Sequence, residues 1–389
     1  MAKLTDGARL GTRAIHAGQP PEPKTGAVMV PVFQTSTYAQ PAPGDALEGH
    51  EYARTSNPTR TALQECIASL EGGKHGVCFS SGLGAVDAIA RMLRPGDRMV
   101  SGDDVYGGTW RLFNKVIEPM GVQCDFIDLN TVDLATAIPD GTRLVWLESP
   151  TNPLLKCFDL EAIIDHAHRA GALVAVDNTF ATPVFQRPLD FGADFVLHST
   201  TKYLNGHSDV VGGVIVTNSD ELHEQLCFIQ NSVGAVPGPW DCFLTLRGLK
   251  TLHVRMAEHQ RSGLALAQWL ATHPEVKRVH YPLLESDPNY AVARKQMSGF
   301  GGMVSFVLDG DLDRAIKFVS STRYFTLAES LGGVESLIEL PAIMTHASVP
   351  PENRAALGID DGLIRLSVGI EDLADLRADL EQAFDASRP

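Results

Sequence analysis

Short runs of apolar residues alternate with amphipathic stretches between about residue 59 and residue 245. The apolar runs predict strands at residues 76–79, 98–100, 144–147, 172–176 and 195–197. Helical spacing of apolar residues is found at 61–70, 84–93 and 160–170. Short apolar strands that alternate with helices are typical of a mostly parallel sheet covered on both faces. We therefore expect an α/β fold.

The pattern changes on both sides of this region. Residues 17–50 are rich in proline and glycine and read as an extended arm. After about residue 245 a long helix is predicted at 251–272, followed by a smaller α+β pattern that closes with a helix at 371–384. The sequence thus predicts an N-terminal arm over 1–58, a large domain over 59–250 and a smaller α+β C-terminal domain over 251–389.

Composition narrows the class of protein. The 389 residues include 44% hydrophobic and 20% charged residues, as in an ordinary globular enzyme. The net charge of −15 argues against a nucleic-acid partner. Neither an apolar signal core at the N-terminus nor a run of about 18 apolar residues occurs, so a cytoplasmic protein without a membrane span is expected. The six cysteines lack CxxC spacing and are expected to be buried free thiols.

A lysine, Lys202, follows one apolar run and precedes another, in the segment STTKYLNGHS at 199–208. A partly desolvated lysine loses its proton more easily and can then attack an aldehyde to form a Schiff base. The neighbouring hydroxyls of Ser199 and Thr201 could hold a phosphate beside it. These features suggest pyridoxal 5'-phosphate (PLP) as a cofactor, although a solvated lysine at a strand edge would give the same local pattern.

The other groups that PLP needs each have a candidate. Asp177 ends an apolar strand and could face the ring nitrogen. The turn SSGLGA at 80–85 lies between a strand and a helix, where backbone N–H groups suit a phosphate. Tyr106 precedes two glycines and could stack on a ring, and Arg365 lies within an apolar strand and could bind a carboxylate. Each of these residues could instead have a purely structural role, such as a salt bridge from Arg365 to Glu371.

Two further pairs of residues each allow more than one interpretation. Tyr52 and Arg54 follow the extended arm and could complete a neighbouring subunit's site, or they could be a solvated loop pair. His166 and His168 lie two residues apart on a predicted helix, so their rings do not share a face. We therefore expect no metal site.

With these residues in hand, the chain closely resembles the Cys/Met-metabolism family of PLP-dependent enzymes from about residue 12 to its C-terminus. The resemblance is carried by EYARTSNPTR at 51–60, DDVYGGT at 103–109, TNP at 151–153, VDNT at 176–179, KYLNGHSDVV at 202–211, FTLAESLGG at 325–333, PAIMTHAS at 341–348 and LIRLSVG at 363–369. Agreement over so many long motifs favours the functional interpretation of all these residues over the ordinary structural one.

The resemblance implies a fold and a cofactor site. The fold would be that of the aspartate-aminotransferase-like, fold type I PLP enzymes, with the PLP-binding domain over 59–250. Lys202 would bind the PLP aldehyde, Asp177 would pair with the ring nitrogen and Tyr106 would stack on the ring. The remaining cofactor contacts would come from Ser199, Thr201, Gly82 and Leu83 at the phosphate, Asn152 near the ring hydroxyl, and Tyr52 and Arg54 of a neighbouring subunit. Such enzymes are usually homotetramers built from two dimers with shared sites.

The resemblance also narrows the activity. Arg365 would bind the substrate carboxylate, and Asn152 and Ser330 would line the substrate site. Glu51, Glu329 and Arg111 favour an α,γ-elimination that splits L-cystathionine into cysteine, 2-oxobutanoate and ammonia, with hydrogen sulfide released from cysteine or homocysteine as a side reaction. The alternative on the same scaffold is a γ-replacement that joins an O-acylhomoserine to cysteine. A binding or regulatory module that no longer catalyses is disfavoured, because Lys202, Asp177 and Arg365 are all present.

Overall fold

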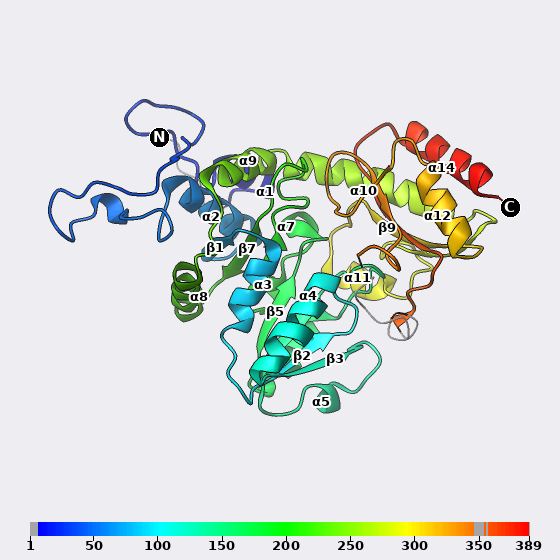
Figure 1. The fold of residues 1–389 in the computed structure, drawn as a ribbon, viewed down its shortest axis with the longest axis horizontal. Coiled ribbons are helices and arrows are strands. Elements are labelled where there is room, and N and C mark those ends of the chain that lie inside the picture. Colours follow the sequence, from blue (N-terminus) through cyan, green and yellow to red (C-terminus); the bar gives the residue numbers. More distant parts are fainter. Residues whose placement is uncertain (1–6, 346–353, 355–356, 389) are drawn as a thin grey trace.

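The computed structural model describes residues 7–345, 354 and 357–388. The N-terminal part leaves the body of the molecule as loops, and the C-terminal part lies at the opposite end (Figure 1). In the arm, α1 spans Leu10–His16 and a 3₁₀ turn spans Leu47–Gly49. A single β-bridge joins Thr37 to Tyr52. The predicted arm is therefore extended over most of its length.

The large part of the molecule is built on a seven-stranded sheet with the order β1-β7-β6-β5-β4-β2-β3. Its strands are β1 (His75–Phe79), β2 (Arg98–Gly102), β3 (Gln123–Ile127), β4 (Thr142–Glu148), β5 (Leu173–Asp177), β6 (Phe195–Ser199) and β7 (Gly213–Thr217). All five predicted strands are present, and the pairing from β6 through β3 is parallel. The predicted mixed α/β fold with a mostly parallel sheet is confirmed.

Both faces of this sheet are buried, as the continuous apolar runs predict. In β4, Leu144 and Trp146 belong to one hydrophobic cluster, whereas Val145 and Leu147 belong to the other. Successive side chains of a strand point to opposite faces, so the two clusters are the two sides of one sheet. Helices therefore cover each face, and only the strand ends are available for chemistry.

Helices of the large part begin and end where local chemistry requires. The Asn57 side chain accepts hydrogen bonds from the N–H groups of Thr59 and Arg60, Pro58 is the first helical residue, and Gly72 ends α2 with φ of +75°. These caps place α2 three residues earlier than predicted. The helices are α2 (Pro58–Glu71), α3 (Gly82–Ala90), α4 (Gly107–Leu112), α5 (Leu134–Ala137), α6 (Leu160–Arg169), α7 (Thr182–Phe185), α8 (Asp220–Val233) and α9 (Pro239–Leu249), with 3₁₀ or π turns at Phe113–Ile117, Glu118–Met120 and Pro188–Phe191.

One strand departs from the parallel pattern, because β7 pairs antiparallel with both β6 and β1. Parallel neighbours need a long crossover, usually a helix, whereas antiparallel neighbours can be joined by a short return of the chain. The connection from β6 to β7 covers residues 200–212 and holds no helix or strand. The chain therefore reverses direction in this loop, and Lys202 belongs to the loop.

The C-terminal part contains a second sheet with the order β10-β11-β12-β9-β8. Its elements are β8 (Val276–His280), β9 (Met303–Leu308), β10 (Thr326–Leu327), β11 (Leu337–Glu339), β12 (Leu363–Ser367), α11 (Tyr290–Gln296), α12 (Leu312–Ser321) and α14 (Leu373–Ser387). The rings of Phe306, Phe318 and Phe384 pack sheet against helices. The long helix α10 (Leu252–Leu270) contacts β8 and β9 as well as α7 of the large part, so it links the two parts (Figure 1).

Other predictions can be compared over the described residues. All six cysteines are free, but Cys124 and Cys227 are only partly buried, which corrects the expectation of six buried thiols. Within residues 7–345, 354 and 357–388, no helix is long and apolar enough to cross a membrane. The last three residues of the PAIMTHAS motif, 346–348, lie outside the described residues.

Candidate active site

A cavity of about 340 Å³ lies between the strand ends of the large sheet and the C-terminal part. Residues from the carboxyl ends of β4, β5 and β6 line it on one side, and Glu329, Ser330 and Arg365 line it on the other. Ligands of open α/β sheets bind outside the carboxyl ends of their strands. The predicted residues Lys202, Asp177, Tyr106, Asn152, Ser199, Thr201, Gly82 and Leu83 also line this cavity.

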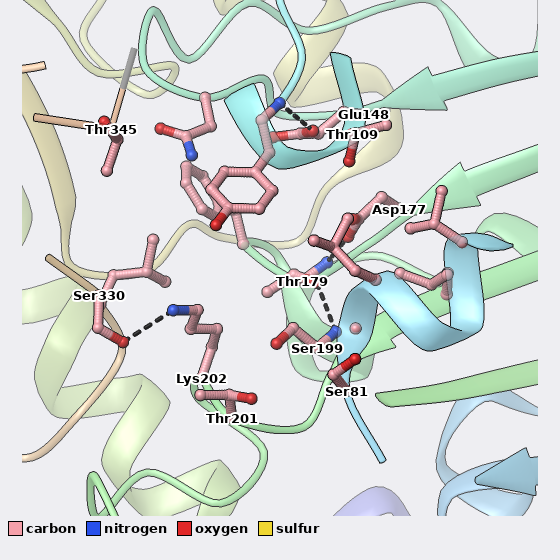
Figure 2. A pocket seen from close by; sticks show the side chains of 18 of the residues that line it. Ser81, Thr109, Glu148, Asp177, Thr179, Ser199, Thr201, Lys202, Ser330 and Thr345 are labelled. Atoms are coloured by element: carbon pink, nitrogen blue, oxygen red, sulfur yellow. Dashed lines mark hydrogen bonds between the residues drawn. The ribbon is translucent and has the colours of Figure 1, made fainter. Parts of the chain in front are cut away.

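Lys202 points into the cavity from the loop between β6 and β7. Its ammonium group donates a hydrogen bond of 2.7 Å to Oγ of Ser330, and Figure 2 shows the two side chains meeting end to end. Burial, together with the positive charge of Arg365, lowers the pKa of Lys202 to about 8. A lysine with this pKa is roughly a tenth neutral at pH 7, so it is a usable nucleophile and base.

The hydrogen-bond partner of Lys202 sits in strained backbone. Ser330 has a φ of +112°, which a residue with a Cβ rarely adopts. Its carbonyl oxygen accepts a hydrogen bond of 3.0 Å from Nη2 of Arg365. Ser330 thus contacts Lys202 with its hydroxyl and Arg365 with its backbone.

Two carboxylates stand side by side at the strand ends opposite, Glu148 buried and Asp177 partly exposed to the cavity. Glu148 of β4 and Asp177 of β5 are register partners on neighbouring parallel strands. Burial raises the pKa of both, and the charge of Asp177 raises that of Glu148 further. Backbone N–H groups of Tyr106 and Thr179 donate to Glu148 and Asp177, respectively, at 2.9 and 3.0 Å. A pair of neighbouring carboxylates of this kind favours a cation at the cavity surface.

The start of α3 forms a cradle beside these carboxylates. The Ser81 hydroxyl caps the helix by accepting from the N–H of Gly84, which leaves the N–H groups of Gly82 and Leu83 at the exposed helix end. A Cβ on Gly82 would lie 3.0 Å from Cβ of Ser199, so glycine permits the close approach of helix and strand end. The backbone N–H of Ser199 is itself fixed by Oγ1 of Thr179 (Figure 2). Such a helix N-terminus is suited to a phosphate.

Arg365 is almost fully buried, with 2% of its surface exposed. Its Nη1 donates to Oδ1 of Asn152 at 2.7 Å and forms an ion pair of 2.9 Å with Glu339. Glu371, the partner considered from the sequence, instead accepts hydrogen bonds from the backbone and hydroxyl of Ser336. The reason is register: Glu339 of β11 stands directly opposite Arg365 of β12.

Tyr106 and Glu329 lie toward the open side of the cavity. The Tyr106 ring lines the cavity, and burial raises the pKa of its phenol while the charge of Arg111 lowers it. Arg111 itself is exposed on α4 and is not among the lining residues. Glu329 is exposed at the mouth.

Besides Arg111, three predicted residues are not brought into this cavity. Glu51, Tyr52 and Arg54 belong to the arm, outside the lining of their own chain's cavity. The Arg54 guanidinium lies 5.1 Å from the centre of the Tyr52 ring and donates to Oδ1 of Asn231 at 3.2 Å. Both side chains are exposed in the single chain, as expected of residues that would act in another subunit.

Comparison with known proteins identifies the family. The family model described as "Cys/Met metabolism PLP-dependent enzyme" matches residues 11–385. This chain belongs to that family. It is therefore a PLP-dependent enzyme of amino-acid metabolism, and the resemblance inferred from the sequence motifs is confirmed.

Named members of the family differ in activity while resembling this chain equally well. A cystathionine gamma-lyase of Dictyostelium discoideum is 55% identical over 97% of this chain and 98% of its own length. A cystathionine beta-lyase of Coxiella burnetii is 52% identical over 97% and 98%, and a cystathionine gamma-synthase of Mycobacterium bovis is 54% identical over 96% of both chains. A solved cystathionine gamma synthase of Xanthomonas oryzae pv. oryzae, in complex with aminoacrylate and cysteine, has a TM-score of 0.95, 47% identity and 98% coverage of both chains.

The residues present fit the cofactor of this PLP family. The neighbouring carboxylates of Glu148 and Asp177 suit a protonated ring nitrogen, and the helix end at Gly82 suits the phosphate. Lys202, with its lowered pKa, lies between them and the C-terminal part. Sequence reasoning missed Glu148, Thr179 and Glu339. Glu148 could have been found as Asp177 was, because it also ends an apolar strand.

Proposed function

We propose that this chain is a cystathionine γ-lyase, which splits L-cystathionine, with the uptake of one water molecule, into cysteine, 2-oxobutanoate and ammonia. The observation that carries the proposal is the charge at the two ends of the cavity. Arg365 lies buried at the inner end and Glu329 is exposed at the mouth. Cystathionine bears an amino acid group at each end, so its inner carboxylate would meet Arg365 and its distal ammonium would meet Glu329.

Nearby charges support the same assignment. Arg111, whose charge acts on the Tyr106 phenol, would bind the distal carboxylate. Glu51 of a neighbouring subunit's arm would join Glu329 at the distal ammonium. An O-acylhomoserine carries no ammonium at its distal end and would leave Glu329 without a partner until cysteine binds.

In the proposed reaction each residue near the reacting carbons holds or moves a proton. Bound PLP supplies the electron withdrawal that makes protons on the substrate's α- and β-carbons removable. Nζ of Lys202 would take the α-proton, and Ser330 would orient it through the hydrogen bond of 2.7 Å. The carboxylate of Asp177 would keep the ring nitrogen protonated. Tyr106 or Lys202 would return a proton to the sulfur as cysteine leaves.

The remaining predicted roles belong to binding. Asn152 would lie near the ring hydroxyl of PLP. The phosphate would be held by Ser199, Thr201 and the backbone of Gly82 and Leu83, with Tyr52 and Arg54 supplied by the neighbouring subunit. We accordingly propose a cytoplasmic homotetramer of two dimers, with a PLP-binding domain over 59–250, and hydrogen sulfide release as a side reaction.

A second candidate is the cystathionine γ-synthase reaction, which the Mycobacterium bovis and Xanthomonas relatives favour. The Coxiella relative adds β-elimination as a third possible outcome on the same scaffold. The three reactions share the inner half of the substrate site and differ in which bond breaks. Product analysis therefore separates them.

The test is to incubate the PLP-loaded enzyme with L-cystathionine and quantify its products. We expect 2-oxobutanoate and cysteine in equal amounts, while pyruvate and homocysteine would indicate β-elimination. A parallel incubation with O-succinylhomoserine and cysteine should form little cystathionine. Strong synthesis with negligible cleavage would overturn the proposal, and Lys202→Ala serves as the inactive control.

A further inference from the structure

Arg365 is held in place by a buried carboxylate that no motif indicated. Glu339 and Arg365 are 1% and 2% exposed, stand opposite each other on β11 and β12, and form an ion pair of 2.9 Å. A buried charge is costly unless it is paired, so each needs the other in the absence of substrate. Arg365 lines the cavity, whereas Glu339 is buried behind it and is not among the lining residues.

The contacts of the Arg365 guanidinium are unevenly distributed. Two oxygens, from Asn152 and Glu339, lie within 2.9 Å of Nη1, and one, from Ser330, lies 3.0 Å from Nη2. Nε is buried and has no hydrogen-bond partner in the described part of the chain. The Nη1 side is therefore occupied, while the edge formed by Nε and Nη2 keeps donors for a carboxylate that binds through both oxygens.

Glu339 is itself fixed from the other side. Its Oε1 accepts a hydrogen bond of 2.8 Å from the hydroxyl of Thr345, a residue that lines the cavity (Figure 2). The same oxygen faces Arg365, so one acceptor atom sets the position of the guanidinium. Glutamine would keep this atom without the negative charge, whereas alanine would remove it.

We propose that Glu339 is a positioning residue that occupies the Nη1 side of Arg365 and so presents the Nε–Nη2 edge to the substrate carboxylate. The inference rests on the proposed function, because it takes Arg365 to be the carboxylate ligand. It predicts that loss of Glu339 weakens ligands that carry a carboxylate and spares ligands that lack one.

The experiment uses two ligands of the PLP-loaded enzyme that carry no leaving group and so cannot undergo elimination. L-Alanine carries the carboxylate, and L-alaninol replaces it with a hydroxymethyl group. Binding of either is followed through the visible absorbance of the cofactor, so no turnover is needed. For E339A we expect the Kd of L-alanine to rise at least about tenfold and that of L-alaninol to stay within about twofold. E339Q should restore L-alanine binding to within about threefold of wild type.

Three other results would contradict the proposed role of Glu339. Equal weakening of both ligands, no weakening in E339A, or an E339Q enzyme as weak as E339A would overturn the inference. R365A separates it from the proposed function: if R365A binds L-alanine as wild type does, the role of Arg365 itself fails. Melting temperature and PLP content are measured for every variant. Should E339A not fold, E339D takes its place, because its shorter side chain withdraws the acceptor from Arg365 and should weaken L-alanine selectively.

Discussion

The two sides of the cavity hold charge in opposite ways. On the sheet side, Glu148 and Asp177 are like charges placed side by side, and burial raises the pKa of each. On the C-terminal side, Glu339 and Arg365 are opposite charges that already neutralise each other. A like-charged pair is completed by a cation, whereas a neutral pair with spare donors accepts an anion. In the function that we propose, one side would therefore hold the ring nitrogen of PLP and the other a substrate carboxylate.

The largest expected effect comes from removing one charge of the sheet-side pair. In Asp177→Asn the ring nitrogen loses its counter-ion, so kcat/KM for cystathionine cleavage should fall on the order of 1,000-fold, about 4 kcal/mol of transition-state stabilisation. Steady-state kinetics at saturating PLP measure this, and PLP content per subunit is determined in parallel.

Glu148→Gln is the matched control for this prediction. Glu148 accepts from the backbone of Tyr106, and an amide oxygen can still accept that bond. We expect a loss of about tenfold or less. Equal losses in the two variants would mean that the carboxylates share the role, and the assignment of Asp177 alone to the ring nitrogen would be wrong.

The next largest effect is expected from a substitution in the neutral pair of Glu339 and Arg365. Arg365→Lys keeps the positive charge opposite Glu339 but loses the planar fork that binds a carboxylate through two hydrogen bonds. We expect kcat/KM to fall about 100-fold, mainly through a higher KM. A fall confined to kcat, with KM unchanged, would show that Arg365 does not bind substrate in the ground state.

Lys202, which lies between the two sides, should make the rate of PLP attachment depend on pH. Because burial and Arg365 lower the pKa of Lys202 to about 8, its neutral fraction rises with pH, reaches one half at about pH 8 and approaches completion roughly one unit higher. The rate at which PLP attaches to cofactor-free protein should therefore rise about tenfold per pH unit below about pH 8 and level off above. Pyridoxamine phosphate, which lacks the aldehyde, is the control and should not show this rise. A midpoint near the usual lysine pKa would show that Lys202 is solvated.

The sequence predicted the sheet side better than the C-terminal side, for a physical reason. A residue that ends an apolar strand of a parallel sheet lies at the ligand edge whatever its neighbours are, so Asp177 could be placed from its own segment. The partner of Arg365 depends on which strand lies beside β12 and in what register. Glu371 is near Arg365 in sequence, but Glu339 is the residue that the register places opposite it.

The same distinction explains the other differences. The helix α2 was predicted with a late start because capping by Asn57 depends on hydrogen bonds that hydrophobic spacing does not reveal. The antiparallel β7 follows from the absence of a helix in the segment that carries Lys202, which apolar runs alone do not show. Roles for residues of the arm could be proposed only through family resemblance, because these residues are not among those that line their own chain's cavity.

The smallest expected effect lies at the mouth of the cavity, where both sides meet solvent. Glu329 is exposed, and an exposed ion pair contributes about 0.2–1 kcal/mol. Glu329→Gln should therefore raise KM for cystathionine up to about fivefold and leave KM for homocysteine, which has no distal ammonium, within about twofold. The difference should shrink as salt is added, because ions screen exposed charges. Glu285→Gln, an exposed acid outside the cavity lining, controls for the change in net charge and should alter neither KM. If Glu329→Gln raised both KM values equally, the charge at the mouth would act on the entry of any amino acid, and its use to distinguish cystathionine from shorter substrates would be lost.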